Sequence, residues 1–595
     1  MRLSKIISEL NRRNVFKATL AYLAVAWLVI QIASIILPAF DAPDYAIKIL
    51  IYLLSGGLFF WVVFSWIYDL TPEGLKKTGD APVDIEINRL NNRRLNTVIV
   101  SALFLAVFLL VIASFWAGSQ WNEGVFSSET KRVAILPFVE KANGGSQEYF
   151  RSGLTEGLID ELSKVDQLKV LSLSSSSLLA AGFSPTNMLM VNEVKLVDYF
   201  INGAFERYEN NLAIKIRISQ EMDADPIWQK SYNGDLSEIR QLWARAARDL
   251  ASHLGVEVQQ EDLVLWANLR SIRPETYELY LKGKHYLNKS TYEDWNRGLV
   301  YLQEAIDQNP GDPYAYAGMA EGYITIGHSL MPPSDVFYKA EAAAKRAIQL
   351  DSLNAEGWAA LAHYHTYFGW DWQLAEYAFK KADELNPNMA YNHYHRAWYL
   401  ALFGRMNEAI EEHKRAQEID PFTPLHSAWL GILYSWVGLY EEGMAEADKA
   451  LQSQKNYALS IFVKGTILME KGETEAGLKY LKKAAEINSG WKYMGYGRAL
   501  LQAGHLEEGS KIIEELESME TTPFGSLCLA YMYVELKKYD RAFECLDKAK
   551  GHAFYPWIRV MMTDEGFKKD PRYLELIHEM NLPDPAPLNF DPDLL

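Results

Sequence analysis

From residue 274 onward the chain repeats itself, and this repeat limits the possible fold more than any other feature of the sequence. A helix pair of 34 or so residues cannot bury its apolar face alone, so neighbouring pairs stack, and small residues at fixed positions let the paired helices approach closely. The sequence therefore predicts an all-α solenoid of about eight helix pairs over residues 270–550, closed by a C-terminal capping segment at 551–595. The recurring small residues, at successive spacings of 42, 35, 34, 34, 34, 32 and 33, are Gly298, Ala340, Ala375, Ala409, Gly443, Gly477, Gly509 and Ala542.

Three long apolar runs precede the repeats. Residues 18–40, 49–67 and 97–121 contain no charged side chain. As a helix, each run is long enough to cross a hydrocarbon core of roughly 30 Å. A cleaved signal peptide followed by buried core helices fits poorly, because there are three such runs and no small-residue cleavage site follows the first. We therefore expect a short tail at 1–17 and a three-span membrane region at 18–121.

Basic residues predict the direction of these spans. The tail and the loop at 71–96 are rich in Lys and Arg, whereas the short connection at 41–48 carries two Asp and one Lys. Basic loops remain in the cytoplasm, so an odd number of spans would place everything after about residue 121 on the other side. In a Gram-negative bacterium that side is the periplasm. The expected location is the bacterial inner membrane, multi-pass, with the large C-terminal part in the periplasm.

Residues 130–256 have the pattern of a small α/β domain. Short apolar runs predict buried strands, and apolar residues at helical spacing predict helices. The expected strands are 133–138, 168–173, two strands joined by a turn at Asn210 and Asn211, and 225–235, and the expected helices are 147–164 and 236–254.

The order of four segments resembles the TolB amino-terminal-like domain of bacterial membrane proteins. The segments are VAILPF, EYFRSGLTEGLIDELSKVDQLKVLS, VDYFINGAFERYENNLAIKIRIS and IWQKSYNGDLSEI, and the later units WAALAHYH, AWLGILY and LCLAYMY are similar to TPR repeats. In that family the domain follows membrane spans, precedes TPR repeats and has no known catalytic residues. The resemblance implies a multidomain chain of three transmembrane helices, a small α/β domain and a TPR solenoid. Some members carry a cyclase domain or a winged helix-turn-helix before the spans, but residues 1–17 are too few for either.

Motifs for catalysis and cofactor binding are missing from the sequence. The loop VEKANGG contains Gly144 and Gly145 but lacks the lysine and hydroxyl residue of a phosphate loop. The serine run at 172–179 lacks the flanking glycines of a nucleophile elbow. We therefore expect a protein that is not an enzyme and that uses no cofactor.

Metal and nucleic-acid binding are not expected either. The histidine pairs 363 with 365 and 393 with 395 are each spaced two residues apart, which points their side chains to different faces of a helix. The net charge of −17 gives no basic surface for nucleic acid. Cys528 and Cys545 are too few for a disulfide scaffold, although the sequence leaves a single disulfide bond between them as an alternative.

Aromatic residues recur at the positions that line the concave side of such an array, on the first helix of each pair. One interpretation is ordinary core packing, and the other is a groove that grips a peptide or an extended segment. On the second interpretation the partner-binding residues are His363, Tyr367, Tyr394, His395, Trp398, Trp429, Trp436 and Phe462.

Two functions follow from this organisation. The first is a membrane-anchored, non-catalytic scaffold whose extracytoplasmic array binds a protein or peptide partner in the cell envelope. The second is a transmembrane sensor or regulatory component that passes periplasmic binding to a cytoplasmic partner through the basic loop at 71–96.

Overall fold

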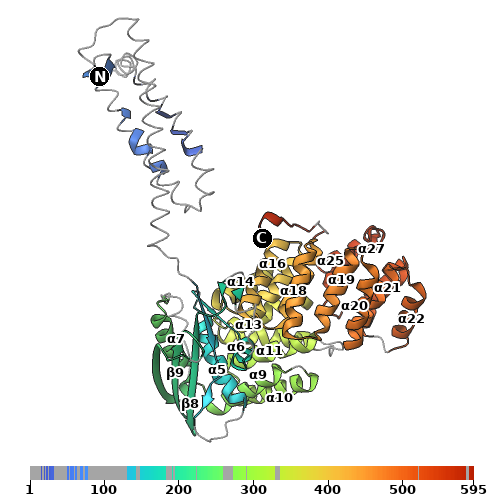
Figure 1. Cartoon of the computed structure of the whole chain (residues 1–595), viewed down its shortest axis with the longest axis horizontal. Coiled ribbons are helices and arrows are strands. Elements are labelled where there is room, and N and C mark those ends of the chain that lie inside the picture. Colours follow the sequence, from blue (N-terminus) through green and yellow to red (C-terminus); the bar gives the residue numbers. More distant parts are fainter. Residues whose placement is uncertain are drawn as a thin grey trace. The chain divides into compact units, whose positions relative to one another are not determined.

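The chain divides into two compact units, Met1–Ser127 and Ser128–Leu595, in a computed structural model (Figure 1). The structure describes scattered residues between 15 and 77, and then residues 130–594 except for 142–147, 166, 183–189, 192–193, 223, 257, 259–271, 290, 329–335, 520–521 and 585–587. In the first unit, β1 (Tyr68–Thr71) pairs with β2 (Gly74–Lys77) as an antiparallel hairpin.

The three-span prediction has to be corrected. A helix that crosses a bilayer needs about 20 consecutive apolar residues, and no helix among the described residues is both long enough and apolar enough. The predicted inner-membrane location rested on those spans and is corrected with them. Much of the three apolar runs, including all of 97–121, lies outside the described residues, as do Gly144 and Gly145 of the VEKANGG loop.

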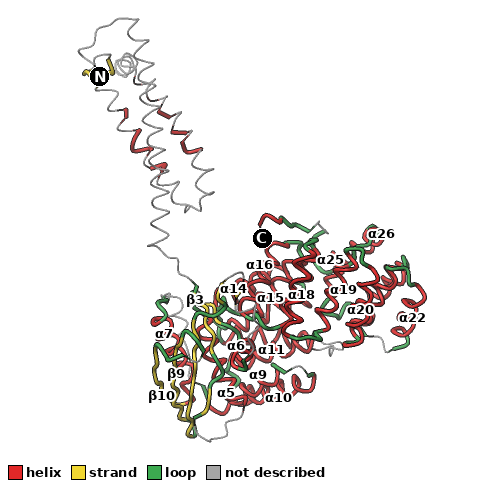
Figure 2. The backbone as a smooth tube through the Cα atoms, viewed as in Figure 1, coloured by secondary structure: helices red, strands yellow, loops and turns green. Residues whose placement is uncertain are grey.

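The second unit begins with a mixed six-stranded sheet. Its strand order is β10-β9-β8-β3-β5, with β4 pairing to β8. Figure 2 draws the strands in yellow. Strand β3 is parallel to β5 and β8, whereas β8, β9 and β10 are antiparallel neighbours. The strands are β3 (Lys131–Ile135), β4 (Val139–Glu140), β5 (Leu168–Val170), β8 (Tyr199–Tyr208), β9 (Asn211–Ser219) and β10 (Trp228–Asp235), and β6 (Met190–Val191) with β7 (Val194–Lys195) forms a separate hairpin.

Helices α5 (Glu148–Ser163) and α7 (Ile239–His253) pack together in the core beside this sheet. Alternate residues of β9, among them Leu212, Ile214 and Ile216, are at most 2% exposed, as expected for a strand with one buried face. The short helices η1 (Leu236–Glu238) and α6 (Leu173–Ala180) complete the sheet region.

The rest of the chain is a TPR-like array. Within the described residues it contains eight helix pairs, coloured from light green to red in Figure 1. The pairs are α9 (Pro274–Leu287) with α10 (Tyr292–Gln308), α11 (Pro313–Gly327) with α12 (Val336–Leu350), α13 (Ala355–Tyr364) with α14 (Trp372–Leu385), α15 (Ala390–Leu402) with α16 (Met406–Ile419), α17 (Pro424–Trp436) with α18 (Tyr440–Ser453), α19 (Ala458–Glu470) with α20 (Thr474–Ile487), α21 (Gly497–Gln502) with α22 (Leu506–Glu517), and α23 (Pro523–Glu535) with α24 (Tyr539–Ala549).

The recurring small residues sit where the two helices of a pair touch. A Cβ atom placed on Gly443 of α18 would lie 2.9 Å from the carbonyl oxygen of Gly431 on α17. The same contact recurs in the first pair, where a Cβ on Gly298 would lie 2.9 Å from the carbonyl oxygen of Gly283. Ala409 occupies the equivalent position in α16 and is fully buried. The period in the sequence therefore reflects close backbone contact inside each pair.

The sheet region is fixed to the array at a distant point of the chain. Asn388, in the loop before α15, donates from Nδ2 to the carbonyl oxygens of Ser163 at 3.0 Å and Leu168 at 2.7 Å. The carboxylate of Asp420 accepts from Ser172 at 2.7 Å and from Ser175 at 2.5 Å. Ser172 and Ser175 belong to the serine run, so that run caps α6 and anchors the fourth helix pair.

The C-terminal segment, residues 551–594, follows the last helix pair and packs against it. Its ordered pieces are η4 (Tyr555–Trp557), α25 (Ile558–Met561), α26 (Glu565–Lys568), α27 (Pro571–Glu579) and η5 (Pro592–Leu594). The ring of Phe567 stacks on Phe543 of α24 at 4.7 Å, so α26 covers the last helix pair.

Candidate functional site

The eight predicted partner-binding residues, here called the aromatic face, come from four consecutive helix pairs. His363 lies on α13, and Tyr367 lies on the π-helical turn η2 (His365–Gly369) that follows it. The remaining members are Tyr394, His395 and Trp398 on α15, Trp429 and Trp436 on α17, and Phe462 on α19.

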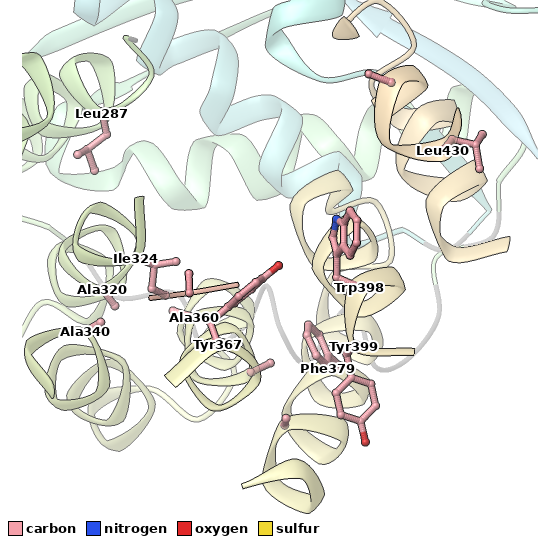
Figure 3. Packing of buried hydrophobic residues seen from close by; sticks show 14 of the residues in the cluster. Leu287, Ala320, Ile324, Ala340, Ala360, Tyr367, Phe379, Trp398, Tyr399 and Leu430 are labelled. Carbon is pink, nitrogen blue, oxygen red and sulfur yellow. The ribbon is translucent and has the colours of Figure 1, made fainter. Parts of the chain in front are cut away.

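One part of the aromatic face is built around His395. Its Nδ1 lies 2.7 Å from the hydroxyl oxygen of Tyr367. Its ring centroid is 4.1 Å from that of His363 and 4.6 Å from that of Tyr394. These contacts join two successive helix pairs into one packed layer, and Figure 3 shows Tyr367 among the buried residues of that layer.

The other part of the aromatic face is built around Trp398. Its ring meets Trp429 edge-to-face, with centroids 4.8 Å apart, and Trp436 at 5.7 Å. Phe462 lies apart from this group and stacks on Trp491 at 4.4 Å. Seven of the eight predicted residues therefore fall into two groups of ring contacts, and Phe462 begins another aromatic contact further along the array.

Burial divides the aromatic face into two sets. His363, Tyr367, His395 and Trp398 are at most 4% exposed, so they act as core residues in this conformation. Tyr394, Trp429, Trp436 and Phe462 are half-buried. Only the second set presents surface to another molecule.

The C-terminal segment supplies the cover over the buried set. The ring of Trp557 stacks on Tyr367 at 5.1 Å and meets Trp398 edge-to-face at 6.0 Å. Phe554 lies 6.4 Å from Trp429. Trp557 itself is fully buried. The array thus holds a segment that is distant in the sequence against its own aromatic face.

Hydrogen bonds to backbone carbonyl groups hold the same segment in place. The guanidinium of Arg559 donates to the carbonyl oxygen of Leu402, and the indole of Trp372 donates to that of Met580 at 2.8 Å. The amide of Asn589 donates to the carbonyl oxygen of Gly404 at 2.7 Å. The bonds to Leu402 and Gly404 use carbonyl groups at and beyond the end of α15, where a helix leaves acceptors unpaired.

Histidines in the aromatic face are neutral packing groups. Burial lowers the pKa of His363 well below its ordinary value, and the neighbouring His328 adds to the effect. Burial likewise lowers the pKa of His395, assisted by His363 and His328. Neither ring nitrogen of His363 has a hydrogen-bond partner among the described residues. Protonation would place an unsolvated charge among aromatic rings, so these side chains stay uncharged at neutral pH.

His393 behaves differently from its neighbours. Burial acts to lower its pKa, but the hydrogen bond and the charge of Glu412, with the charge of Asp383, outweigh burial and raise it. The Nδ1 atom lies 2.7 Å from the Glu412 carboxylate, and Nε2 lies 2.9 Å from the carbonyl oxygen of Pro387. In the part of the chain that the structure describes, no group of three or more His, Cys, Asp or Glu side chains is arranged to hold a metal ion.

The aromatic residues of the C-terminal segment were not among the predicted site residues. The sequence AFYPWIRVMM at 553–562 contains Phe554, Tyr555 and Trp557, and that density of aromatic residues was the available signal. A capping role for 551–595 did not predict their contacts with η2 and α15, because sequence spacing does not reveal contacts between distant repeats.

Comparison with known proteins supports the repeat and little else. The chain is 26% identical over 211 residues to the transcriptional regulator HilA of Salmonella typhimurium, a match that covers 34% of this chain and 37% of HilA. It is 24% identical over 234 residues to a putative adenylate cyclase 3 of Rhizobium meliloti, covering 39% of each chain. It is 27% identical over 108 residues to the TPR repeat-containing protein MJ0940 of Methanocaldococcus jannaschii, covering 18% of this chain and 34% of that protein. The chain therefore spans less than two fifths of the length of each of these relatives.

Solved structures with some likeness to this chain include a TPR protein and a hetero-tetramer. The thermophilic TPR protein TTC0263 of Thermus thermophilus aligns with 32% of this chain and 99% of its own, at 20% identity and a TM-score of 0.28. The Cut9–Hcn1 assembly aligns with 58% of this chain and 62% of its own, at 13% identity and a TM-score of 0.34.

The helix pairs, their period and the match to a TPR repeat-containing protein define the class: the second unit carries a TPR-like array joined to a small α/β sheet. No protein-family model matches the chain. The resemblance of residues 130–256 to a TolB amino-terminal-like domain therefore stays a prediction.

Proposed function

We propose that this protein is a non-catalytic scaffold whose TPR-like array binds a protein or peptide partner. The observation that carries the proposal is the seating of the C-terminal segment on the aromatic face. The array already grips a peptide segment there, through the stacking of Trp557 on Tyr367 and the hydrogen bonds to Leu402 and Gly404. Aromatic rings on one face and backbone carbonyl groups that accept hydrogen bonds beside it are the elements that peptide recognition needs.

The half-buried set of the aromatic face is the proposed contact surface for the partner. Trp429 and Trp436 lie on α17 and Phe462 lies on α19, and all three are half-buried. Trp429 lies next to Phe554 of the seated segment. Trp398 of the buried set packs against the rings of Trp429 and Trp436. The partner would therefore extend the surface that the C-terminal segment begins.

A non-catalytic role agrees with the chemistry of this face. The histidines beneath it are buried and neutral, and their described neighbours are aromatic rings, with no carboxylate hydrogen-bonded to His363 or His395. A general base needs both access to substrate and a pKa near the working pH.

Site-specific photocrosslinking in the full chain, in cells, tests this function. A photoreactive residue replaces Trp436 in one variant and Tyr338 in a matched control, because Tyr338 is an aromatic residue of α12 that is 60% exposed. We expect a discrete crosslinked partner from position 436 and none from position 338. The yield at 436 should fall at least about tenfold when Trp429→Ala is added, as for a central aromatic anchor.

Two results would speak against the scaffold. Equal crosslinking from both positions would mean that the aromatic face has no selectivity. A yield at 436 that is unchanged by Trp429→Ala would mean that the partner does not use the aromatic rings.

A further inference from the structure

A cavity of about 270 Å³ lies between helix α5 of the sheet region and the first helices α9, α11 and α13 of the array. This size is near the lower end for small-molecule sites. None of the aromatic-face residues lines it, so it is separate from the proposed partner surface.

Acidic groups outnumber basic groups around this cavity. Two of the basic residues are neutralised locally: Lys164 lies 2.7 Å from Glu161, and Lys284 lies 2.7 Å from Glu321 and 3.8 Å from Glu356. The third basic residue, Arg240, lies 3.6 Å from Asp312, which is not part of the lining. The lining carboxylates are Glu156, Asp160, Glu161, Glu321 and Glu356, and the lining cations are Lys164, Arg240 and Lys284.

Glu156 and Asp160 are the carboxylates left over. They are four residues apart on α5, which places them on the same face of the helix. Neither forms a hydrogen bond or ion pair with any described residue, and both face the cavity. Burial raises the pKa of Asp160 well above its ordinary value, and the charges of Glu156 and Glu356 raise it further. The charges of Lys284 and Lys164 act on Asp160 in the opposite direction, but both lysines already form ion pairs with other carboxylates, Lys164 with Glu161 and Lys284 with Glu321 and Glu356.

Two further residues of the lining each bury one polar atom that has no partner among the described residues. Glu161 is 5% exposed, and its Oε2 atom has no hydrogen-bond partner among the described residues. Asn354, on the opposite wall before α13, is 2% exposed, and its Nδ2 atom is also unpaired within the described part of the chain. Buried polar groups are normally satisfied, so unpaired atoms on two walls point to a missing polar ligand.

Aromatic side chains form the remaining wall. Tyr277 and Tyr280 from α9, Trp243 from α7 and Tyr391 from α15 line the cavity. Aromatic faces attract ammonium and guanidinium groups, more strongly when water is excluded. A bare metal ion would gain nothing from these rings, and the described carboxylates are not gathered in a metal-binding arrangement.

We propose that this cavity is a binding site for a small organic cation that carries an ammonium or guanidinium group. The cation lies against Glu156 and Asp160, and its hydrocarbon part lies against the tyrosine wall. The site joins α5 to α9 and α13, so an occupied cavity ties the sheet region to the array. This inference does not depend on the scaffold function.

Thermal unfolding and calorimetry of the full chain test the site with agmatine, which carries an ammonium and a guanidinium group. A ligand that binds only the folded state raises Tm. We expect millimolar agmatine to raise Tm, and the uncharged 1,5-pentanediol and Mg²⁺ to leave it unchanged at equal concentration and ionic strength. The absence of a shift with agmatine, or an equal shift with either comparison compound, would overturn the proposal.

The double variant Glu156→Gln with Asp160→Asn locates the binding. Its Tm without ligand should equal or exceed that of the natural chain, since two unpaired carboxylates are gone. Its affinity for agmatine should fall at least about tenfold, because hydrogen bonds between charged groups are lost. Should the double variant fail to fold, Asp160→Asn alone removes one of the two carboxylates that have no ion-pair partner among the described residues, and it carries the same expectation.

A matched control removes the same charge from the surface. Glu441→Gln with Glu507→Gln changes two carboxylates whose side chains are 81% and 86% exposed. This control should bind agmatine like the natural chain. Equal loss of affinity in the control and in the cavity variant would mean that agmatine responds to net charge, and the cavity site would be refuted.

Discussion

Replacing His413 should make the protein less sensitive to acid, by an amount that the structure defines. His413 on α16 is fully buried, with Nε2 2.9 Å from the carbonyl oxygen of His426 and Nδ1 unpaired among the described residues. Burial, with a smaller contribution from the charge of His426, lowers its pKa from 6.5 to about 3. Because the folded pKa is below the unfolded value, the unfolded chain takes up the proton first.

The sign and size of the effect follow from that difference. The stability that neutral His413 contributes is complete above pH 6.5 and is lost as the pH falls toward 3. At pH 5.0, which is about 1.5 units below the unfolded pKa, the loss is about 2 kcal/mol. The variant His413→Gln keeps an amide donor but cannot titrate. Relative to the natural chain, its free energy of unfolding should therefore improve by about 2 kcal/mol when the pH is changed from about 7.5 to about 5.0.

Urea unfolding of both proteins at the two pH values measures this change. Both proteins contain the other titrating groups, so the contributions of these groups cancel when the two free energies of unfolding are subtracted. One such group is His393, whose raised pKa makes the folded state more stable as the pH falls. His578→Gln serves as the control, since the His578 side chain is 60% exposed. A stability difference between the natural chain and His413→Gln that is the same at both pH values would refute the argument that His413 is buried and neutral.

Two further predictions concern the C-terminal segment and the cysteines. Trp557→Ala leaves a cavity at a fully buried site beside Tyr367 and should lower the free energy of unfolding by about 3–5 kcal/mol, measured by urea titration. A loss below about 1 kcal/mol would mean that the C-terminal segment does not pack as described. Cys528 and Cys545 are free and buried, and burial raises the pKa of both thiols. A thiol reagent should therefore label both cysteines slowly in the native protein and quickly in urea. Fast labelling of Cys528 in the native protein, or a change of protein mass on reduction, would contradict this prediction.

Much of the fold follows from local patterns in the sequence. The strand and helix positions of the sheet region and the helix pairs of the array come from periodicity within short stretches, as at β9 and at the contact of Gly443 with α17. The membrane spans show the limit of such patterns. Three uniformly apolar runs predicted three membrane-spanning helices, but no helix among the described residues has the length and composition that a span requires.

The aromatic face was predictable in position but not in environment. The repeat register placed its eight residues on or just after first helices, and seven of them do pack in two groups of ring contacts, around His395 and around Trp398. Whether such residues are core or surface depends on what covers them. The cover is Trp557, which comes from a segment that the sequence connects only to the last helix pair.

The sequence by itself determined the small-residue period, the helix pairs that follow from it, and the set of aromatic residues on or just after the first helices. Only the tertiary structure decided that residues 551–562 lie against η2 and α15, and that Glu156 and Asp160 line one cavity with Tyr280 and Asn354. The physical reason is that contacts within a helix pair depend on local spacing. Contacts between distant pairs depend instead on small rotations that add up from one repeat to the next, and no single stretch of sequence records that sum.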